Sequence, residues 1–175
     1  MERIYAPWRS AYFSMPKEGG CLFCDVQRTE HDSEVGILAR ATHWFVILNM
    51  FPYTSGHLMV SLRRHEDSLL GGSDAERAEV PAALERARRA LTTEYRPDGF
   101  NLGLNLGAAA GAGVPGHLHW HIVPRWSGDT NFMPAVAATR VLPEALSETY
   151  RRLLAALAAL PPQGLRVTDR GHAPS

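Results

Sequence analysis

The chain has 175 residues, of which 45% are hydrophobic, and this length suits one globular domain with a substantial core. Its 18 basic and 18 acidic residues give a formal net charge of zero, which argues against a nucleic-acid partner or an anionic membrane surface. A local site for a small anionic ligand remains compatible with this composition.

The first 20 residues are expected to form an N-terminal arm that carries several aromatic side chains. This stretch has no apolar core region and no small-residue cleavage site, so we predict no signal peptide. No apolar run approaches the length needed to span a bilayer, and a cytoplasmic location is expected. In a reducing compartment the pair Cys21 and Cys24 favours a metal site or a redox pair over a structural disulfide.

Four segments have the composition or alternation of strands, and short or glycine-rich connections join two pairs of them. The first two form a hairpin around the turn FPYTSG, and the last two are joined by the glycine-rich run GAAAGAGVPG. These strands are expected over residues 43–50, 57–62, 100–107 and 117–123.

Two longer segments have helical signals. A capping box at residues 73–76 predicts a helix that runs to about Tyr95, with a kink or a restart at Pro81. Apolar residues at helical spacing predict a second helix within 143–160, and the tail over 161–175 is expected to end in disorder. Strands with short connections and segregated helices together predict an α+β domain on an antiparallel sheet.

The stretch GHLHWHIVPRW, residues 116–126, places a histidine at every second position. On a strand such residues share one face and lie roughly 6.5 to 7 Å apart, so His117, His119 and His121 are expected to form a row. The intervening residues are expected to face the core: Leu118, Trp120 and Ile122. Three interpretations remain open for the row: a polar sheet face, a tris-imidazole metal site, or a histidine nucleophile flanked by groups that orient it and bind an anion.

The preceding strand offers a surface that could complete such a site. Its polar face carries Asn101 and Asn105, with Gly103 and Gly107 in alternation, and glycine allows a ligand to approach the backbone closely. The connecting glycine-rich run is either a flexible turn or a loop whose N–H groups bind phosphate oxygens. Beside the histidine row, phosphate binding is the favoured interpretation.

These motifs resemble the histidine triad (HIT) family of nucleotide hydrolases and transferases. HLHWHIV matches the signature His-φ-His-φ-His-φ-φ, in which φ is apolar, and HWFVILNMFPYTSGHLMVSLRRH resembles the family's first hairpin. DGFNLGLNLG resembles the strand before the triad, and VPRWSGDTNFMP resembles the continuation in bacterial members that are similar to diadenosine tetraphosphate phosphorylases. The resemblance spans about residues 20–145. It implies a HIT-like fold over residues 21–160, with about five antiparallel strands, two main helices and a homodimer.

The resemblance implies a role for each of three histidines. His119 matches the nucleophile, which forms a covalent nucleotidyl-histidine intermediate, and neutral imidazole is a competent nucleophile near neutral pH. His121 matches the position that contacts the phosphate and assists the leaving group. His57 matches a buried histidine behind the active site, although an ordinary core histidine is the alternative.

The same resemblance assigns residues to nucleotide binding. Asn49 matches the residue that hydrogen-bonds the ribose, and Asn105 matches a polar residue near the phosphates. Many hydrolases of the family have Gly-Gln-Ser/Thr-Val-x-His before the triad, whereas this chain has GAGVPGH, with Ala112 and Gly113 in place of side-chain donors. Phosphate binding must then rely on backbone N–H groups, with Gly113 the best candidate. This departure leaves room for an acceptor other than water, such as orthophosphate.

Some branches of the family bind structural zinc through a CxxC pair, a further histidine and the first triad histidine. The matching set here is Cys21, Cys24, His65 and His117, a proper tetrahedral set for Zn²⁺, with reduced thiols and no metal as the alternative. No organic cofactor is expected, and no metal ion is expected to take part in the reaction.

The predicted function is a phosphorylase or nucleotidyltransferase that acts on dinucleoside polyphosphates. The alternatives are a hydrolase that releases a nucleoside monophosphate and a nucleotide-binding regulatory module.

Overall fold

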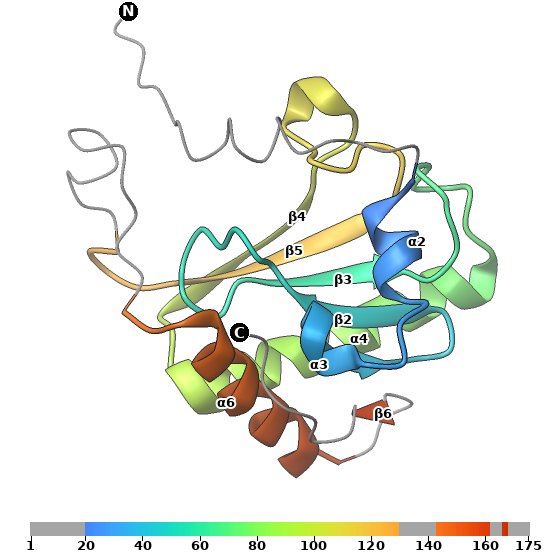
Figure 1. Cartoon of the computed structure of the whole chain (residues 1–175). Helices are drawn as coiled ribbons and strands as arrows, with labels where there is room; N and C mark the ends of the chain where they lie inside the picture. Colours follow the sequence, from blue (N-terminus) through green and yellow to red (C-terminus); the bar gives the residue numbers. More distant parts are fainter. Residues whose placement is uncertain (1–19, 130–142, 162–165, 168–175) are drawn as a thin grey trace, which may run out of the picture.

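The protein is described by a computed structural model that covers residues 20–129, 143–161 and 166–167 (Figure 1). Nearly all of the expected N-terminal arm and most of the expected tail lie outside these ranges, as does the end of the motif VPRWSGDTNFMP. Among the described residues, no helix is both long and apolar enough to cross a membrane.

The described strands form one sheet in which every pair of neighbours is antiparallel. Their spatial order is β4-β5-β3-β2-β1-β6, which places β5 inside the sheet and β4 at one edge. The bounds are β1 Ile37–Arg40, β2 Trp44–Leu48, β3 Leu58–Leu62, β4 Gly99–Leu104, β5 His119–Arg125 and β6 Arg166–Val167. The expected α+β antiparallel fold is therefore present, with six strands in the described residues where about five were expected.

Helices cover both faces of this sheet. In Figure 1, α4 lies behind the strands, whereas the short helix α2 lies in front of them. The helical bounds are α2 Leu22–Val26, α3 Asp32–Val35, α4 Asp74–Tyr95, α6 Leu146–Ala159 and the 3₁₀ helix η1 Ala108–Ala110. The two long helices, α4 and α6, are the two that were expected from sequence. The structure adds α2, α3, β1 and β6, which are short and carry little periodic signal of their own.

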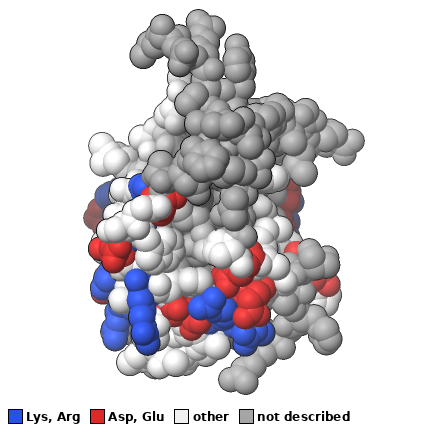
Figure 2. All heavy atoms as spheres, turned by 90° about the vertical axis from the view of Figure 1, so that its left-hand side faces the viewer, with Lys and Arg blue, Asp and Glu red and all other residues white. Residues whose placement is uncertain are grey.

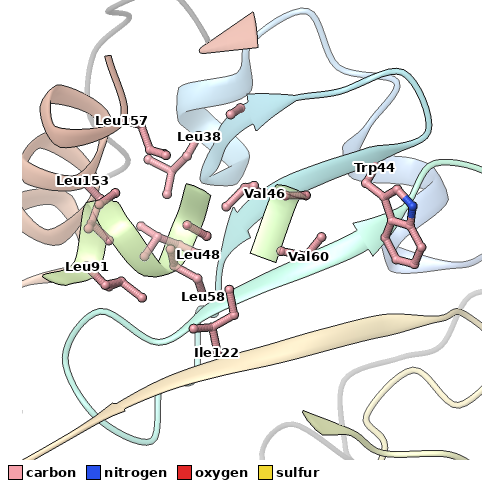
Figure 3. Packing of buried hydrophobic residues seen from close by; sticks show 14 of the residues in the cluster. Leu38, Trp44, Val46, Leu48, Leu58, Val60, Leu91, Ile122, Leu153 and Leu157 are labelled. Atoms are coloured by element: carbon pink, nitrogen blue, oxygen red, sulfur yellow. The ribbon is translucent and has the colours of Figure 1, made fainter. Parts of the chain in front are cut away.

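The core on the α4 and α6 side is formed by alternate residues of the central strands (Figure 3). Trp44, Val46 and Leu48 of β2 point into this cluster, whereas Phe45 and Ile47 point to a smaller cluster that contains Phe23 of α2. All five residues of β2 are buried, because helices cover the sheet on both sides. The sheet is therefore fixed between two apolar layers.

Helix α4 begins as its capping box predicts. The Ser73 hydroxyl accepts the Glu76 N–H at 3.2 Å, and the Glu76 carboxylate accepts the Ser73 N–H at 2.6 Å. A bond from the Arg64 guanidinium holds the pKa of the Glu76 carboxyl down to about 2. Pro81 lies inside this helix on its exposed side, and α4 continues through it as one helix without the restart that was considered.

Charged side chains are intermixed on the face of the molecule seen in Figure 2, where basic groups lie beside acidic ones. Some charged side chains of the protein pair across elements. Arg152, on α6, donates to Glu94, on α4, at 2.7 Å and to Glu144 at 2.6 Å. This arrangement agrees with the zero formal net charge of the chain.

Candidate active site

Strand β5 carries the central and third histidines of the triad. It lies between β3 and β4, so that His121 pairs with Met59 on one side and with Gly103 on the other. His119 pairs with Ser61 of β3. The intervening apolar residues Leu118, Trp120 and Ile122 belong to the core or pack against it, which confirms their predicted direction.

His117 precedes the strand instead of belonging to it. Its N–H donates to the carbonyl of Val114 at 3.3 Å, in a turn, and ladder pairing begins only at His119. The imidazole Nε2 of His117 lies 2.6 Å from the carbonyl oxygen of Leu62. Because a carbonyl only accepts, Nε2 carries the proton and Nδ1 keeps its lone pair. Of the three histidines expected in a row, two therefore lie on β5 and the third lies in the turn just before it.

The geometry around His119 leaves one ring nitrogen available for chemistry. Nδ1 lies 2.7 Å from the carbonyl oxygen of His117 and must donate to it, so the lone pair of the neutral ring is on Nε2. The residue is buried, and this burial lowers the pKa of the His119 imidazole, an effect that the bond to the carbonyl opposes. His119 is therefore a neutral imidazole at neutral pH with a defined tautomer.

His121 is linked to a second, fully buried imidazole. Nε2 of His57 lies 3.0 Å from Nδ1 of His121. The other nitrogen of His57, Nδ1, accepts the Tyr53 N–H at 3.1 Å and lies 3.3 Å from Nδ2 of Asn49. His57 therefore donates from Nε2, and His121 accepts at Nδ1 and carries its own proton on Nε2. Burial, together with the nearby His119, lowers the pKa of the His121 imidazole to about 4.

The predicted binding residues lie in two places. Asn49 follows β2 and reaches His57, while its Oδ1 accepts the Phe51 N–H at 2.9 Å. The amide of Asn105, just beyond β4, lies 3.5 Å from Nε2 of His121. Gly103, opposite His121, faces open space, since an added Cβ would meet nothing within 4 Å. The structure thus brings both asparagines to the linked pair of imidazoles.

Gly113 lies half-buried in the loop between η1 and β5. Its neighbour Ala112 is buried, and Val114 packs against the smaller apolar cluster. The predicted contact of the Gly113 N–H with phosphate stays a prediction.

Four residues that are far apart in sequence meet on the α2 side of the sheet. Cys21, Cys24, His65 and His117 place one ligand atom each within 4.8 Å of all the others. The Sγ atom of Cys21 lies 3.1 Å from Nδ1 of His117, and the Sγ atom of Cys24 lies 3.5 Å from Nδ1 of His65. The predicted set is therefore assembled, and the lone pair on Nδ1 of His117 points into it.

These distances fit a metal ion with tetrahedral coordination. Zinc bonds of about 2.3 Å to sulfur and about 2.0 to 2.1 Å to nitrogen place neighbouring ligand atoms roughly 3.3 to 3.8 Å apart. Burial and the adjacent Cys21 thiol raise the pKa of the Cys24 thiol to about 11, so a cation close to its sulfur would be needed to stabilise the Cys24 thiolate at neutral pH. Two thiolates and two imidazoles are a donor set that suits Zn²⁺.

Two aromatic residues of the site were not identified from sequence. Phe23, between the two cysteines, packs its ring 4.7 Å from that of His119 and 5.2 Å from that of His117, measured between centroids. Tyr53 packs 4.6 Å from His57 and 6.2 Å from His121. An aromatic residue within CLFC and another within the hairpin turn were visible in the sequence, but no local pattern related them to the histidines.

The family model for the HIT domain matches residues 29–128, more than half of the chain. The chain belongs to the HIT family. A curated relative in this family, the AP-4-A phosphorylase of Mycobacterium tuberculosis, is 44% identical over 164 residues, covering 89% of this chain and 83% of the relative.

Solved structures share this fold. A zinc-bound histidine triad family protein from Mycobacterium smegmatis superposes with a TM-score of 0.64 at 29% identity, covering 79% of this chain and 94% of that one. A uridylyltransferase structure has a TM-score of 0.64 at 23% identity, covering 91% of this chain and 52% of that one, and shows the likeness of fold alone. The expected HIT-like fold is therefore confirmed.

Proposed function

We propose that this HIT protein is a phosphorylase of dinucleoside polyphosphates that works through a covalent nucleotidyl group on His119. The observation that carries the proposal is the tautomer of His119, whose Nδ1 is held by the His117 carbonyl at 2.7 Å while Nε2 keeps a lone pair. The relative named AP-4-A phosphorylase, 44% identical over most of both chains, supports the substrate class.

In the first step, Nε2 of His119 attacks the α-phosphorus of diadenosine tetraphosphate and the P–O bond to the other half breaks. ATP leaves, and the adenylyl group stays on the imidazole, whose new positive charge is stabilised by the bond from Nδ1 to the carbonyl. The Nε2–H of His121 is proposed to donate a hydrogen bond to the leaving oxygen while keeping its proton. In the second step, orthophosphate attacks the same phosphorus, the P–N bond breaks, and ADP forms.

The other residues have supporting roles in this proposal. His57 is fully buried and bonds to His121, so it positions that ring and its proton instead of touching the substrate. Asn49 is proposed to bind the ribose, while Asn105 and the N–H of Gly113 bind phosphate oxygens. Since Ala112 and Gly113 offer no side-chain donor, no side chain from them can orient an attacking water, which favours orthophosphate as acceptor.

We also propose that the four-residue cluster holds a structural zinc ion, through Cys21, Cys24, His65 and His117. When bound, the ion would cross-link α2 to the turn that precedes β5, and it takes no part in the reaction. The donor atoms and their separations support this assignment, as does the zinc-bound neighbour from M. smegmatis.

A homodimer is part of the same proposal. Strand β4 lies at an edge of the sheet, and Leu102 and Leu106 on or beside it are about half exposed, at 49% and 51%. A second copy could cover both the unpaired edge and these side chains. Sedimentation velocity measures the oligomeric state directly.

The deciding experiment is product analysis with diadenosine tetraphosphate, with and without orthophosphate. ADP plus ATP, formed only when phosphate is present, supports the phosphorylase. AMP plus ATP under either condition would instead identify the hydrolase.

His119→Ala should lower turnover by about three orders of magnitude or more, whereas His31→Ala, at an exposed histidine outside the site, should leave it unchanged. Near-normal turnover by His119→Ala would refute the nucleophile. Nucleotide binding without turnover by the unmodified protein would favour the regulatory module.

A further inference from the structure

Helix α2 contacts both the cysteine–histidine cluster and the proposed nucleophile. Cys21 precedes the helix and Cys24 lies within it, and both contribute sulfur atoms to the cluster. Between them, Phe23 turns its side chain toward the sheet, where it is 1% exposed. Its ring packs against His117 and His119 at once. One five-residue helix therefore joins the two sites.

The ring of His119 depends on packing for its orientation. The hydrogen bond from Nδ1 to the His117 carbonyl would by itself let the ring pivot about that bond and swing Nε2 away from a substrate phosphorus. Two neighbours oppose this motion: Phe23 at 4.7 Å, tilted by 38°, and the ring of His121 at 5.1 Å, edge-on at 72°. Of these, Phe23 is the apolar group that also excludes water from this side.

The location of Phe23 depends in turn on the cluster. Helix α2 has only five residues, and Cys21 at its N-cap makes no side-chain capping bond. So short a helix is unstable on its own and is held by tertiary contacts. These contacts include the burial of Phe23 and the approach of both sulfurs to the imidazole of His117, at 3.1 and 3.6 Å.

We propose that Phe23 is a positioning residue for His119, and that α2 thereby transmits the order of the cysteine–histidine cluster to the nucleophile. This inference rests on the proposed function only in taking His119 as the attacking group. Phe23 keeps Nε2 on its line of attack and keeps water away from the ring, without contacting the substrate.

The test compares Phe23→Leu and Phe23→Met with a matched control, Phe45→Leu. Phe45 is fully buried in the same apolar cluster, 6.3 Å from the ring of Phe23, but it lies on β2, which β3 separates from β5. Three properties are measured at full zinc occupancy: kcat and KM for diadenosine tetraphosphate, the rate at which diethyl pyrocarbonate modifies His119, read by peptide mass spectrometry, and the melting temperature.

Both Phe23 variants should lower kcat by about tenfold to a hundredfold, because a small misplacement of a reacting group has effects of that size. Their KM should change by less than about twofold, since substrate contacts remain. Modification of His119 should become several-fold faster. Phe45→Leu should lower the melting temperature to a similar extent while leaving kcat and the modification rate near those of the unmodified protein.

Equal effects of the Phe23 and Phe45 substitutions would overturn the proposal, because Phe23 would then be an ordinary core residue. Phe23 variants that keep a normal kcat at full zinc occupancy and lose it only when depleted of zinc would overturn it too, since the ring contact itself would then be dispensable. If the unmodified protein does not turn over the substrate, the proposed function fails, and the modification rates alone still decide the contact of Phe23 with His119.

Discussion

The depressed pKa of His121 predicts a measurable acid sensitivity of the fold. Its imidazole is held neutral by burial, with a pKa of about 4 against 6.5 for an ordinary histidine. The pKa is lower in the folded than in the unfolded chain, so the unfolded chain binds the proton first as the pH falls. The folded state therefore loses stability as the pH falls from about 6.5 to about 4, and this group causes no loss above that range.

The size of the effect follows from the two pKa values. Between about pH 7.5 and about pH 5, His121 should lower the free energy of unfolding by about 2 kcal/mol, and by about 3 kcal/mol once the pH is below 4. His121→Asn removes the titrating group and should therefore lose about 2 kcal/mol less than the unmodified protein over the same interval.

Urea denaturation at both pH values measures this difference, with His31→Asn as a control at an exposed histidine outside the site. Contributions from other groups, including release of a bound metal in acid, occur in all three proteins and cancel in the comparison. NMR titration of the imidazole nitrogens gives the pKa of His121 independently. The reasoning is refuted if His121 titrates near 6.5 or if His121→Asn loses as much stability as the control.

Two further predictions concern Arg86 and Cys24. The buried Arg86 guanidinium donates to the carbonyls of Leu157 at 3.0 Å and Leu160 at 3.2 Å, at the end of α6, so Arg86→Met should lower the free energy of unfolding in urea by about 1 to 3 kcal/mol. The exposed neighbour Arg89 provides the control, and an equal loss in Arg89→Met would contradict the capping role. Elemental analysis should find about one zinc per chain, and Cys24→Ser should lower both zinc content and melting temperature. Metal-free protein whose melting is unchanged by the substitution would eliminate the zinc site.

Local signals predicted the long elements well. The capping box at Ser73 located the start of α4, and alternation located β5 and its apolar face. The short elements β1, α2 and α3 were missed because each has four or five residues, too few to establish a period. Their stability comes from neighbours: β1 pairs with β2, and Tyr150 of α6 donates to the Ile37 carbonyl at 3.0 Å.

The metal set was predicted from family resemblance, and the structure brings its members together. Spacing alone could not have selected them, since Cys21 and His117 are 96 residues apart. The pairing of β3 with β5 brings the loop that carries His65 to the turn that carries His117, where the Leu118 N–H donates to the backbone carbonyl of Glu66 at 2.6 Å. A contact of this kind depends on strand order, which local composition does not encode.

By itself, the sequence determined the periodicities of the long elements and the chemistry available to them. It indicated that His119 and His121 share a face, and that two thiols and two imidazoles could form a ligand set. Only the tertiary structure decided the protonation pattern, because a tautomer depends on the group opposite each ring nitrogen: the His117 carbonyl for His119 and the imidazole of His57 for His121. It also decided that Phe23 packs on His119, since the burial of a side chain depends on which distant segments fold over it.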